Sequence, residues 1–314
     1  MSDDRRLDDA ARAGWLYYVA RRTQDEIARE LGVSRQKAQR LVAQAAQAGL
    51  VKVRLEHPIA RCMELAAQLA GRFDLSVAQV APSDPSAPEL LDGIASPAAT
   101  EMERTLLEDE PRIVALGTGR ALTAAVEQVQ RMDRPQHRIV SLLGNMLMDG
   151  SASRFSATVR LAERTGARHY PMALPVFARD AAEVTMLHSQ PPVASTLALC
   201  AQAHVAFVGI APVTEDSPMV MDGFVEVAEV REMIRQGAVG EITGWAFDAG
   251  GQVLKGGHNE RVAGAPLLPG PDRPTIGVAN GPAKVTAIRA ALSGRLVNGL
   301  VTDEATAASL LAQA

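Results

Sequence analysis

The sequence predicts an α/β protein with two parts, a small helical unit followed by a larger unit built on a mostly parallel sheet. Two observations support this prediction. Apolar residues recur at helical spacing in the N-terminal segment, and beyond it short β-branched segments alternate with glycine turns and helical patterns. Such alternation is typical of a parallel sheet with helices on both faces. A chain of 314 residues is long enough for both units.

Composition narrows the classes of function. Hydrophobic residues make up 47% of the chain and charged residues 22%, as in ordinary globular proteins, which excludes a disordered chain. The lone cysteines Cys62 and Cys200 exclude a disulfide framework and favour a reducing compartment. No apolar segment approaches the roughly 18 residues that a membrane span needs, and the charged start lacks a secretion signal. We therefore expect a cytoplasmic protein that binds no membrane.

The N-terminal unit is expected to contain three helices. The first spans residues 7–20, and residues 23–51 predict two more, joined by a tight turn. Gly32 can adopt the positive φ that ends the second helix, and Ser34 can cap the third. The residues expected to pack inward are Leu7, Ala11, Trp15, Tyr18, Ile27, Leu31, Val33, Ala38, Leu41 and Val42.

The outer face of the third helix is predicted to contact double-stranded DNA. Arginine can bind guanine and glutamine can bind adenine in the major groove, each through two hydrogen bonds. Residues 21–54 carry eight basic and three acidic side chains, although the whole chain has a net charge of -4. The alternative is an exposed hairpin whose basic residues only keep it soluble. The expected base contacts are Arg35, Gln36 and Gln39, and the expected phosphate contacts are Arg22, Lys37 and Arg40, with Ser34 beside them.

A short strand or wing over residues 51–56 is expected to separate the two units. Its letters, VKVRLE, alternate apolar and polar residues before Pro58. We place the boundary there, which gives units of residues 1–56 and 57–314. The larger unit is expected to begin with a helix over residues 61–73, followed by the first strand of the sheet.

A glycine-bearing turn follows the strand predicted over residues 113–116. Gly117 and Gly119 let the backbone approach an anion at the start of the next helix, whose free amides attract it. Thr118 and Arg120 add a hydroxyl and a guanidinium group. The alternative is an ordinary strand-to-helix turn. A nucleotide cofactor is disfavoured, because the turn has neither a P-loop ending nor a full dinucleotide fingerprint.

Polar residues also stand at other predicted strand ends, where ligands bind in open α/β sheets. Lys284 follows Gly281 and Pro282 at a helix start and can reach a phosphate or a sugar hydroxyl, or it is a solvated surface lysine. Asn145 can hydrogen-bond a polyol, or it stands in a turn for backbone reasons. Asp248 can hold sugar hydroxyls, or it caps its own hairpin.

Catalytic and metal chemistry receive little support. The six histidines stand far apart, none at metal-ligand spacing. His258 can serve as a loop donor to a ligand, although a solvated loop histidine is the favoured interpretation. No GxSxG elbow is present, so we predict no catalytic residue and no metal. An isomerase or deaminase acting on phosphosugars remains the alternative, with Asp248, Glu241 or Asp149 as its base. A DNA-binding protein without a ligand is disfavoured by the size of the second unit.

An ordered set of motifs resembles the SorC/DeoR-type sugar-binding transcriptional regulators over essentially the full chain. The segment TQDEIARELGVSRQKAQRLVAQAAQAGLV corresponds to the family's helix-turn-helix, and ALGTGRAL, VSLLGN, HVAFVGI, GAVGEITGWAFD, IGVANGPAKVTAIRAAL and LVTDEAT follow in the family's order. The resemblance implies a winged-helix-like DNA-binding domain and a Rossmann-like effector domain similar to ribose phosphate isomerase and glucosamine phosphate deaminase. It also implies homodimers or homotetramers on operator DNA, tuned by a sugar, sugar phosphate or polyol.

Carried over onto this chain, the resemblance assigns an effector site and marks several departures. Many relatives have Asp at His204 and two glycines at Asn280 and Gly281, and these changes are expected to reshape the pocket. Residues 36–39 replace the commoner Pro-Lys-Val-Ser, which is expected to alter the operator. Arg120 replaces a smaller residue of some relatives, which affects the form of the anion. The assigned site consists of Gly117, Thr118, Gly119, Arg120, Asn145, Asp248 and Lys284.

Overall fold

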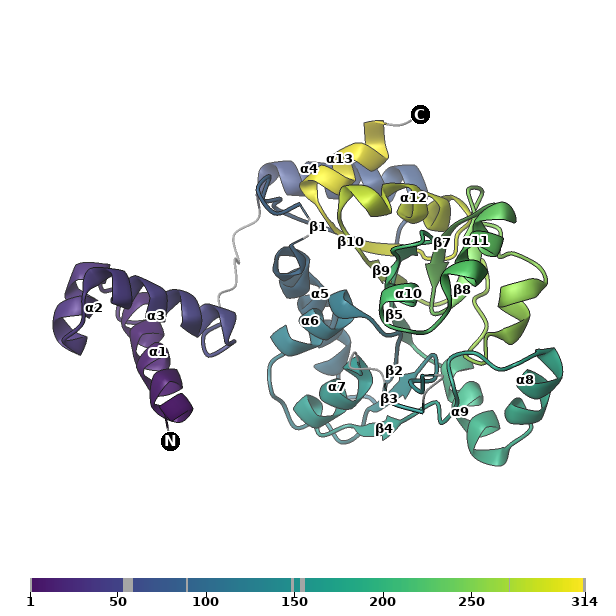
Figure 1. Cartoon of the computed structure of the whole chain (residues 1–314), viewed down its shortest axis with the longest axis horizontal. Helices are drawn as coiled ribbons and strands as arrows, with labels where there is room; N and C mark the ends of the chain where they lie inside the picture. The colour runs from purple at the N-terminus through teal and green to yellow at the C-terminus, as the bar shows by residue number, and fades with distance from the viewer. Residues whose placement is uncertain are drawn as a thin grey trace. The chain divides into compact units, whose positions relative to one another are not determined.

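The computed structural model describes residues 2–52, 59–88, 90–147, 150–152, 156–270 and 272–312 (Figure 1). The chain divides into two compact units, Met1–His57 and Pro58–Ala314. Of the strand predicted over residues 51–56, only Val51 and Lys52 are described, and neither belongs to a strand. The remainder of that prediction lies outside the described residues.

The first unit contains the helices α1 (Ser2–Tyr18), α2 (Gln24–Leu31) and α3 (Arg35–Gln47). Local capping explains the ends of α2 and the start of α3. Thr23 and Glu26 form a reciprocal capping box at the start of α2, and Gly32 ends this helix with a φ of 64°. The hydroxyl of Ser34 accepts the N–H of Lys37 at 3.2 Å, which confirms the predicted cap of α3.

The buried face of α1 is offset from the predicted apolar stripe. A Cβ atom added to Gly14 would lie 2.7 Å from the Cβ atom of Ala45 in α3, so the two helices approach too closely for a bulky side chain at their contact. Trp15 is instead 56% exposed. The prediction was therefore wrong for Leu7, Trp15 and Tyr18, and the residues buried in their place are Ala10, Ala13 and Leu16.

The two faces of α3 differ as predicted. Ala38, Leu41 and Val42 are buried together with Ile27 of α2, in one apolar cluster. On the outer face, the guanidinium of Arg35 lies 3.5 Å from a carboxylate oxygen of Asp25 in α2. This exposed ion pair contributes little to stability. The residues of α3 that were predicted to contact DNA are all exposed, namely Arg35, Gln36, Lys37, Gln39 and Arg40.

The described part of the larger unit contains a seven-stranded and a three-stranded sheet. Their strands are β1 (Val77–Ala81), β2 (Ile113–Leu116), β3 (Arg138–Ser141), β4 (Arg168–Tyr170), β5 (Val205–Gly209), β6 (Ala211–Pro212), β7 (Ala238–Ile242), β8 (Trp245–Asp248), β9 (Thr275–Val278) and β10 (Gly299–Asp303). The larger sheet has the order β1-β10-β9-β5-β2-β3-β4 with parallel neighbours, which confirms the predicted α/β class. The antiparallel sheet β6-β7-β8 was not predicted.

Helices lie on both faces of the larger sheet. The helices described in the larger unit are α4 (Ala60–Phe73), α5 (Leu91–Leu106), α6 (Arg120–Gln128), α7 (Ala157–Thr165), α8 (Ala181–His188), α9 (Pro191–Ala201), α10 (Pro218–Met221), α11 (Val227–Arg235), α12 (Val285–Ser293) and α13 (Glu304–Ala312), with short 3-10 turns η1 (Gly257–Arg261) and η2 (Pro282–Lys284). One core contains Leu122 of α6 and Leu161 of α7, and the other contains Ile288 of α12 and Phe247 of β8. Figure 1 shows α4 beside α13, at opposite ends of the unit's sequence. None of the described helices is both long and apolar enough to cross a bilayer.

The order in which the chain adds strands to the larger sheet reverses at β2, although the strands remain parallel. From β2 the chain continues to β3 and β4 on one side, and it then returns to place β5 on the other side of β2. The loops that leave the carboxyl ends of β2 and β5 therefore diverge. Ligands of open α/β sheets bind at such a point. The fold thus places the turn after β2, residues 117–120, at the edge where a ligand is expected.

Candidate effector site

A cavity of about 500 Å³ lies at this edge of the larger sheet. Its walls come from the loops that follow β2, β5 and β9, and from the segment of residues 214–224 that includes α10. The volume lies within the range of small-molecule sites. Four residues of the assigned effector site line this cavity, namely Thr118, Gly119, Arg120 and Lys284.

The turn after β2 favours glycine at both positions, for different reasons. The N–H of Gly117 donates to the carbonyl of Phe207 at 2.9 Å, and a Cβ atom added to Gly117 would lie 3.1 Å from a methyl carbon of Thr243. Gly119 has a φ of 122°, which side-chain-bearing residues rarely adopt. Close packing and backbone conformation therefore account for the glycines, and the helix start that follows them opens onto the cavity.

Both cations that line the cavity interact with carboxylates. Nη2 of Arg120 lies 3.6 Å from Oδ1 of Asp222, which follows α10. The charge of Lys284 acts on the carboxyl group of Glu241 in β7. Asp216 supplies a third carboxylate to the lining. Acidic side chains thus outnumber basic ones in this cavity.

Glu241 has an unusual environment for a carboxyl group. Burial raises its pKa above the ordinary value of 4.5, although the N–H donated by Gly244 at 2.9 Å and the charges of His258 and Lys284 oppose this shift. The ionised form of Glu241 is therefore less favourable in the folded chain than in the unfolded chain.

Replacement of Glu241 by glutamine is expected to stabilise the larger unit at neutral pH. Because the folded-state pKa is raised, ionisation of Glu241 costs folding free energy. This cost is absent below pH 4.5 and grows as the pH rises through the folded-state pKa. The Tm of Glu241→Gln should therefore exceed that of the wild type at about pH 8, and the two should converge at about pH 4.

Glu215→Gln is a matched control for this measurement, because the pKa of Glu215 is shifted in the opposite direction. The side-chain hydrogen bond from Arg231 lowers the pKa of Glu215, so this carboxylate stabilises the fold above its ordinary pKa and loses that effect as the pH falls. Glu215→Gln should therefore lose stability relative to the wild type as the pH rises. A Tm difference for Glu241→Gln that is the same at both pH values would contradict the raised pKa.

Two buried polar atoms of the cavity lining have no hydrogen-bond partner among the residues that the structure describes. Asn280 is 2% exposed, and its Nδ2 donates to the carbonyl of Leu90 and to Oδ2 of Asp303. These two acceptors fix the orientation of the amide. Its Oδ1 has no hydrogen-bond partner within the described part of the chain, and neither has the buried hydroxyl of Ser217. Buried polar atoms of this kind are rarely left unsatisfied, so water or another molecule at the cavity wall is expected to supply these hydrogen bonds.

His258 is buried, and the expectation of a solvated loop residue was wrong. Its Nδ1 lies 2.8 Å from a carboxylate oxygen of Glu229, and its Nε2 lies 2.9 Å from the carbonyl of Gly244. The ring packs against Phe177, with 4.6 Å between the ring centroids. His258 thereby fixes the turn whose Gly244 N–H holds the carboxylate of Glu241.

A cavity of about 30 Å³ adjoins the larger one and shares Thr118 and Leu143 with it. Gly117 and Asn145, both assigned to the effector site, line this smaller cavity. So does His169, whose Nε2 is buried without a partner among the residues that the structure describes. Burial lowers the pKa of His169. The smaller cavity has space for about one water molecule. Asn145 therefore lies beside the larger cavity, since it lines only the smaller one.

Asp248 lies apart from both cavities. Its Oδ1 accepts the N–H groups of Gly250 and Gln252, each at 2.9 Å, within its own hairpin. This is the hairpin-capping role that the sequence left open as an alternative. Of the three candidate bases for an enzyme, only Glu241 lines the larger cavity among the described residues, and Asp149 lies outside them.

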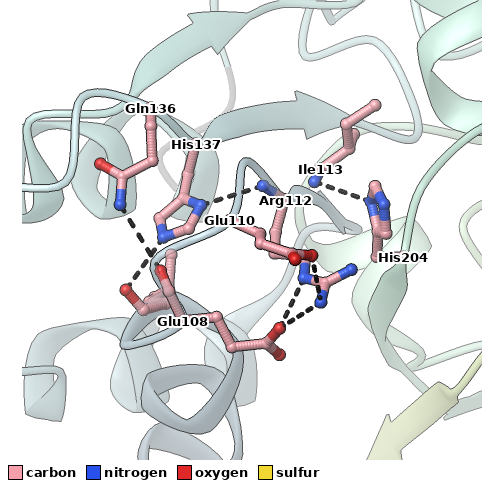
Figure 2. Close-up of polar contacts among 8 residues, drawn as sticks. Glu108, Glu110, Arg112, Ile113, Gln136, His137 and His204 are labelled. Carbon is pink, nitrogen blue, oxygen red and sulfur yellow. Dashed lines mark hydrogen bonds and ion pairs between the residues drawn. The ribbon is translucent and has the colours of Figure 1, made fainter.

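His204 stands at the amino ends of the strands, so the expectation that it reshapes the pocket was wrong. Figure 2 shows its Nδ1 accepting the N–H of Ile113 at the start of β2, at 3.0 Å. His137 accepts the N–H of Arg112 in the same way, at 3.0 Å. Arg112 also pairs with Glu108. This cluster fixes the start of β2, at the end of the strand opposite to the cavity.

The residues that sequence reasoning missed belong mainly to the segment 214–224. Asp216, Ser217 and Asp222 line the cavity from this segment, which follows β5 and β6. A signal was present, because the segment follows a buried strand and carries three carboxylates, of which Asp216 and Asp222 line the cavity. Its function in the site depends on the return of the chain to β5 beside β2, which is a property of the strand order.

The sequence matches a sugar-binding domain family and is similar to proteins named as regulators of catabolism or transcription. The model of the Sugar-bind family, a sugar-binding domain, matches residues 57–312. The chain is 34% identical to the "Erythritol catabolism regulatory protein EryD" of Brucella abortus, over 97% of this chain and 96% of that protein. It is 32% identical to the "Transcriptional regulator LsrR" of Escherichia coli K12, over 97% of this chain and 94% of the other.

Solved structures of transcriptional regulators have a fold similar to that of this chain. The full-length sorbitol operon regulator SorC of Klebsiella pneumoniae superposes with a TM-score of 0.71 at 26% identity, over 98% of this chain and 99% of that one. A DeoR family transcriptional regulator of Listeria monocytogenes superposes with a TM-score of 0.70 at 22% identity. That match covers 79% of this chain and 99% of the other.

Proposed function

This chain belongs to the SorC/DeoR family of sugar-binding transcriptional regulators, and we propose that its cavity at the sheet switch point binds the effector that controls operator binding. In this proposal residues 1–56 bind operator DNA, and residues 57–314 bind a sugar, sugar phosphate or polyol and form the oligomer. Operator binding would place the protein in the cytoplasm. The observation that carries the proposal is the cavity itself, lined by Thr118, Arg120 and Lys284 together with unsatisfied Asn280 and Ser217.

The DNA-binding half of the proposal is supported by the first unit. α2 and α3 are joined by a capped turn, as in a helix-turn-helix, and the exposed face of α3 carries arginine, glutamine and lysine from its first turn. In this arrangement Arg35, Gln36 and Gln39 contact bases, while Lys37, Arg40 and Arg22 contact phosphates. Arg35 would exchange its surface ion pair with Asp25 for a contact to DNA.

The larger unit is proposed to form a homodimer or homotetramer, which would present paired first units to a repeated or palindromic operator. The hairpin of α8 and α9 supports self-association. The sequence of α9, PPVASTLALCA, contains no charged residue, and α8 has no buried residue. Helices that are apolar on several sides are normally covered by protein.

Coupling between the two units follows from linkage. If the effector binds the free conformation more tightly than the DNA-bound one, operator affinity falls by the same factor by which DNA weakens effector binding. The relatives are named as transcriptional regulators and not as enzymes, which supports this function over the isomerase or deaminase alternative.

A thermal-shift screen of the full chain against sugars, alditols and their phosphate esters tests the effector proposal. We expect at least one of these compounds to raise the Tm, because a ligand that binds only the folded state stabilises it. The compound should remain chemically unchanged after incubation. Turnover of the compound would support the enzyme, and the absence of any stabilisation by carbohydrates would contradict the proposed site.

A further inference from the structure

We propose that the cavity selects an uncharged polyol or sugar and discriminates against the phosphate ester of the same compound. The inference rests on the proposed function, since it names the class of effector for the same cavity. The glycine turn at residues 117–120, taken alone, predicts an anion. The side chains that surround this turn in the folded chain favour a neutral ligand instead.

The first argument is the charge of the lining. Arg120 and Lys284 supply two positive charges, and Asp216, Asp222 and Glu241 supply three carboxyl groups. Arg120 already pairs with Asp222 at 3.6 Å, while Lys284 and the carboxyl group of Glu241 line the same cavity. A phosphate ester carries about 1.5 to 2 negative charges at neutral pH. Its binding would therefore require Arg120 to exchange Asp222 for the phosphate, next to the carboxylates of Asp216 and Asp222, which repel it.

The second argument is that many of the polar groups lining the cavity can only accept hydrogen bonds. Oδ1 of Asn280 can only accept hydrogen bonds, and it has no partner among the described residues. The residue is buried, with an exposed fraction of 2%. The carboxylates of Asp216 and Asp222 also accept and do not donate. An ionised phosphate likewise offers only acceptors, whereas each hydroxyl of a polyol can donate to one of these groups and accept from Arg120 or Lys284.

The location of Asp222 makes it the specificity-determining residue in this inference. It follows the short helix α10, in the segment that lines the cavity together with the turn at residues 117–120. Its side chain is 17% exposed, whereas that of Arg120 is 46% exposed. Asp222 thus places a carboxylate 3.6 Å from the guanidinium that a phosphate would otherwise bind.

The experiment measures, by calorimetry on the full chain, the affinities for alditols of four to six carbons and for their terminal phosphate esters, with inorganic phosphate as a further probe. We expect the wild type to bind at least one alditol more tightly than its ester. Asp222→Asn, alone and combined with Asp216→Asn, should raise affinity for the ester about two- to tenfold for each carboxylate removed. Alditol affinity should fall or stay unchanged in the same variants.

Glu215→Gln is the matched control, because it removes one negative charge from the same segment but outside the cavity lining. It should leave the preference between alditol and ester unchanged. Tighter binding of an ester than of its alditol by the wild type would overturn the inference while leaving the proposed function intact. So would an ester affinity that Asp222→Asn does not raise. Failure of every alditol, sugar and ester to bind would instead contradict the proposed function.

Discussion

Combined replacement of Arg35, Gln36 and Gln39 by alanine is expected to weaken specific operator binding by about 100- to 10,000-fold, with a much smaller loss on unrelated duplex. Each bidentate hydrogen-bonded contact to a base contributes about 1–3 kcal/mol of discrimination against other bases. All three side chains lie on the exposed face of α3, so alanine leaves the buried cluster around Ala38 unchanged. Fluorescence anisotropy with the operator and with a scrambled duplex measures both affinities.

Arg40→Ala is the control that separates base contacts from phosphate contacts. Arg40 is exposed on α3 and is assigned to the DNA backbone. The variant should lose similar affinity on operator and scrambled duplex, and the slope of log K against log salt should decrease by about one unit. If the triple variant lost equal affinity on both duplexes, the assignment of the base contacts would be wrong.

Lys284→Ala is expected to produce the largest loss at the effector site, about 10- to 100-fold in effector affinity. A hydrogen bond from a charged donor contributes about 1.5–3 kcal/mol. The substitution also removes the positive charge that partly offsets the burial of Glu241, so the remaining carboxyl group should become still harder to ionise. Titration calorimetry with the best compound of the thermal-shift screen measures the loss.

Lys255→Ala is a suitable control for this prediction. Lys255 is exposed and does not line the cavity, so its replacement removes the same charge at a distance from the site. Effector affinity should remain at the wild-type level in this variant. Equal affinities for wild type and Lys284→Ala would show that the effector does not contact Lys284 and would contradict the cavity.

The sequence predicted the class of the fold and the elements that carry the turns. Strand β2 was predicted with the observed bounds, because four apolar residues followed by glycine are typical of a buried parallel strand. The cap at Ser34 and the positive φ of Gly32 were also predicted from residue type alone. These features depend on neighbours in the chain, and local chemistry therefore determines them.

The errors concern contacts between residues that are distant in the chain. The face of α1 was misassigned because its contact with α3 requires small residues, and amphipathic spacing does not report how closely two helices approach. His204 and His258 have long-range partners, Ile113 and Glu229, which determine their burial and position. The carboxylate of Asp222 lines the cavity because the strand order places β5, and the segment 214–224 that follows it, beside β2.

The most direct test of effector-controlled DNA binding is the affinity of the full chain for its operator, measured by anisotropy with and without a saturating carbohydrate that raises the Tm. We expect the operator affinity to change by about 5- to 150-fold, and the carbohydrate affinity to change by the same factor when operator is present. Operator affinity that is identical with and without a bound carbohydrate would contradict the coupling. Failure to bind any duplex at low ionic strength would contradict DNA binding altogether.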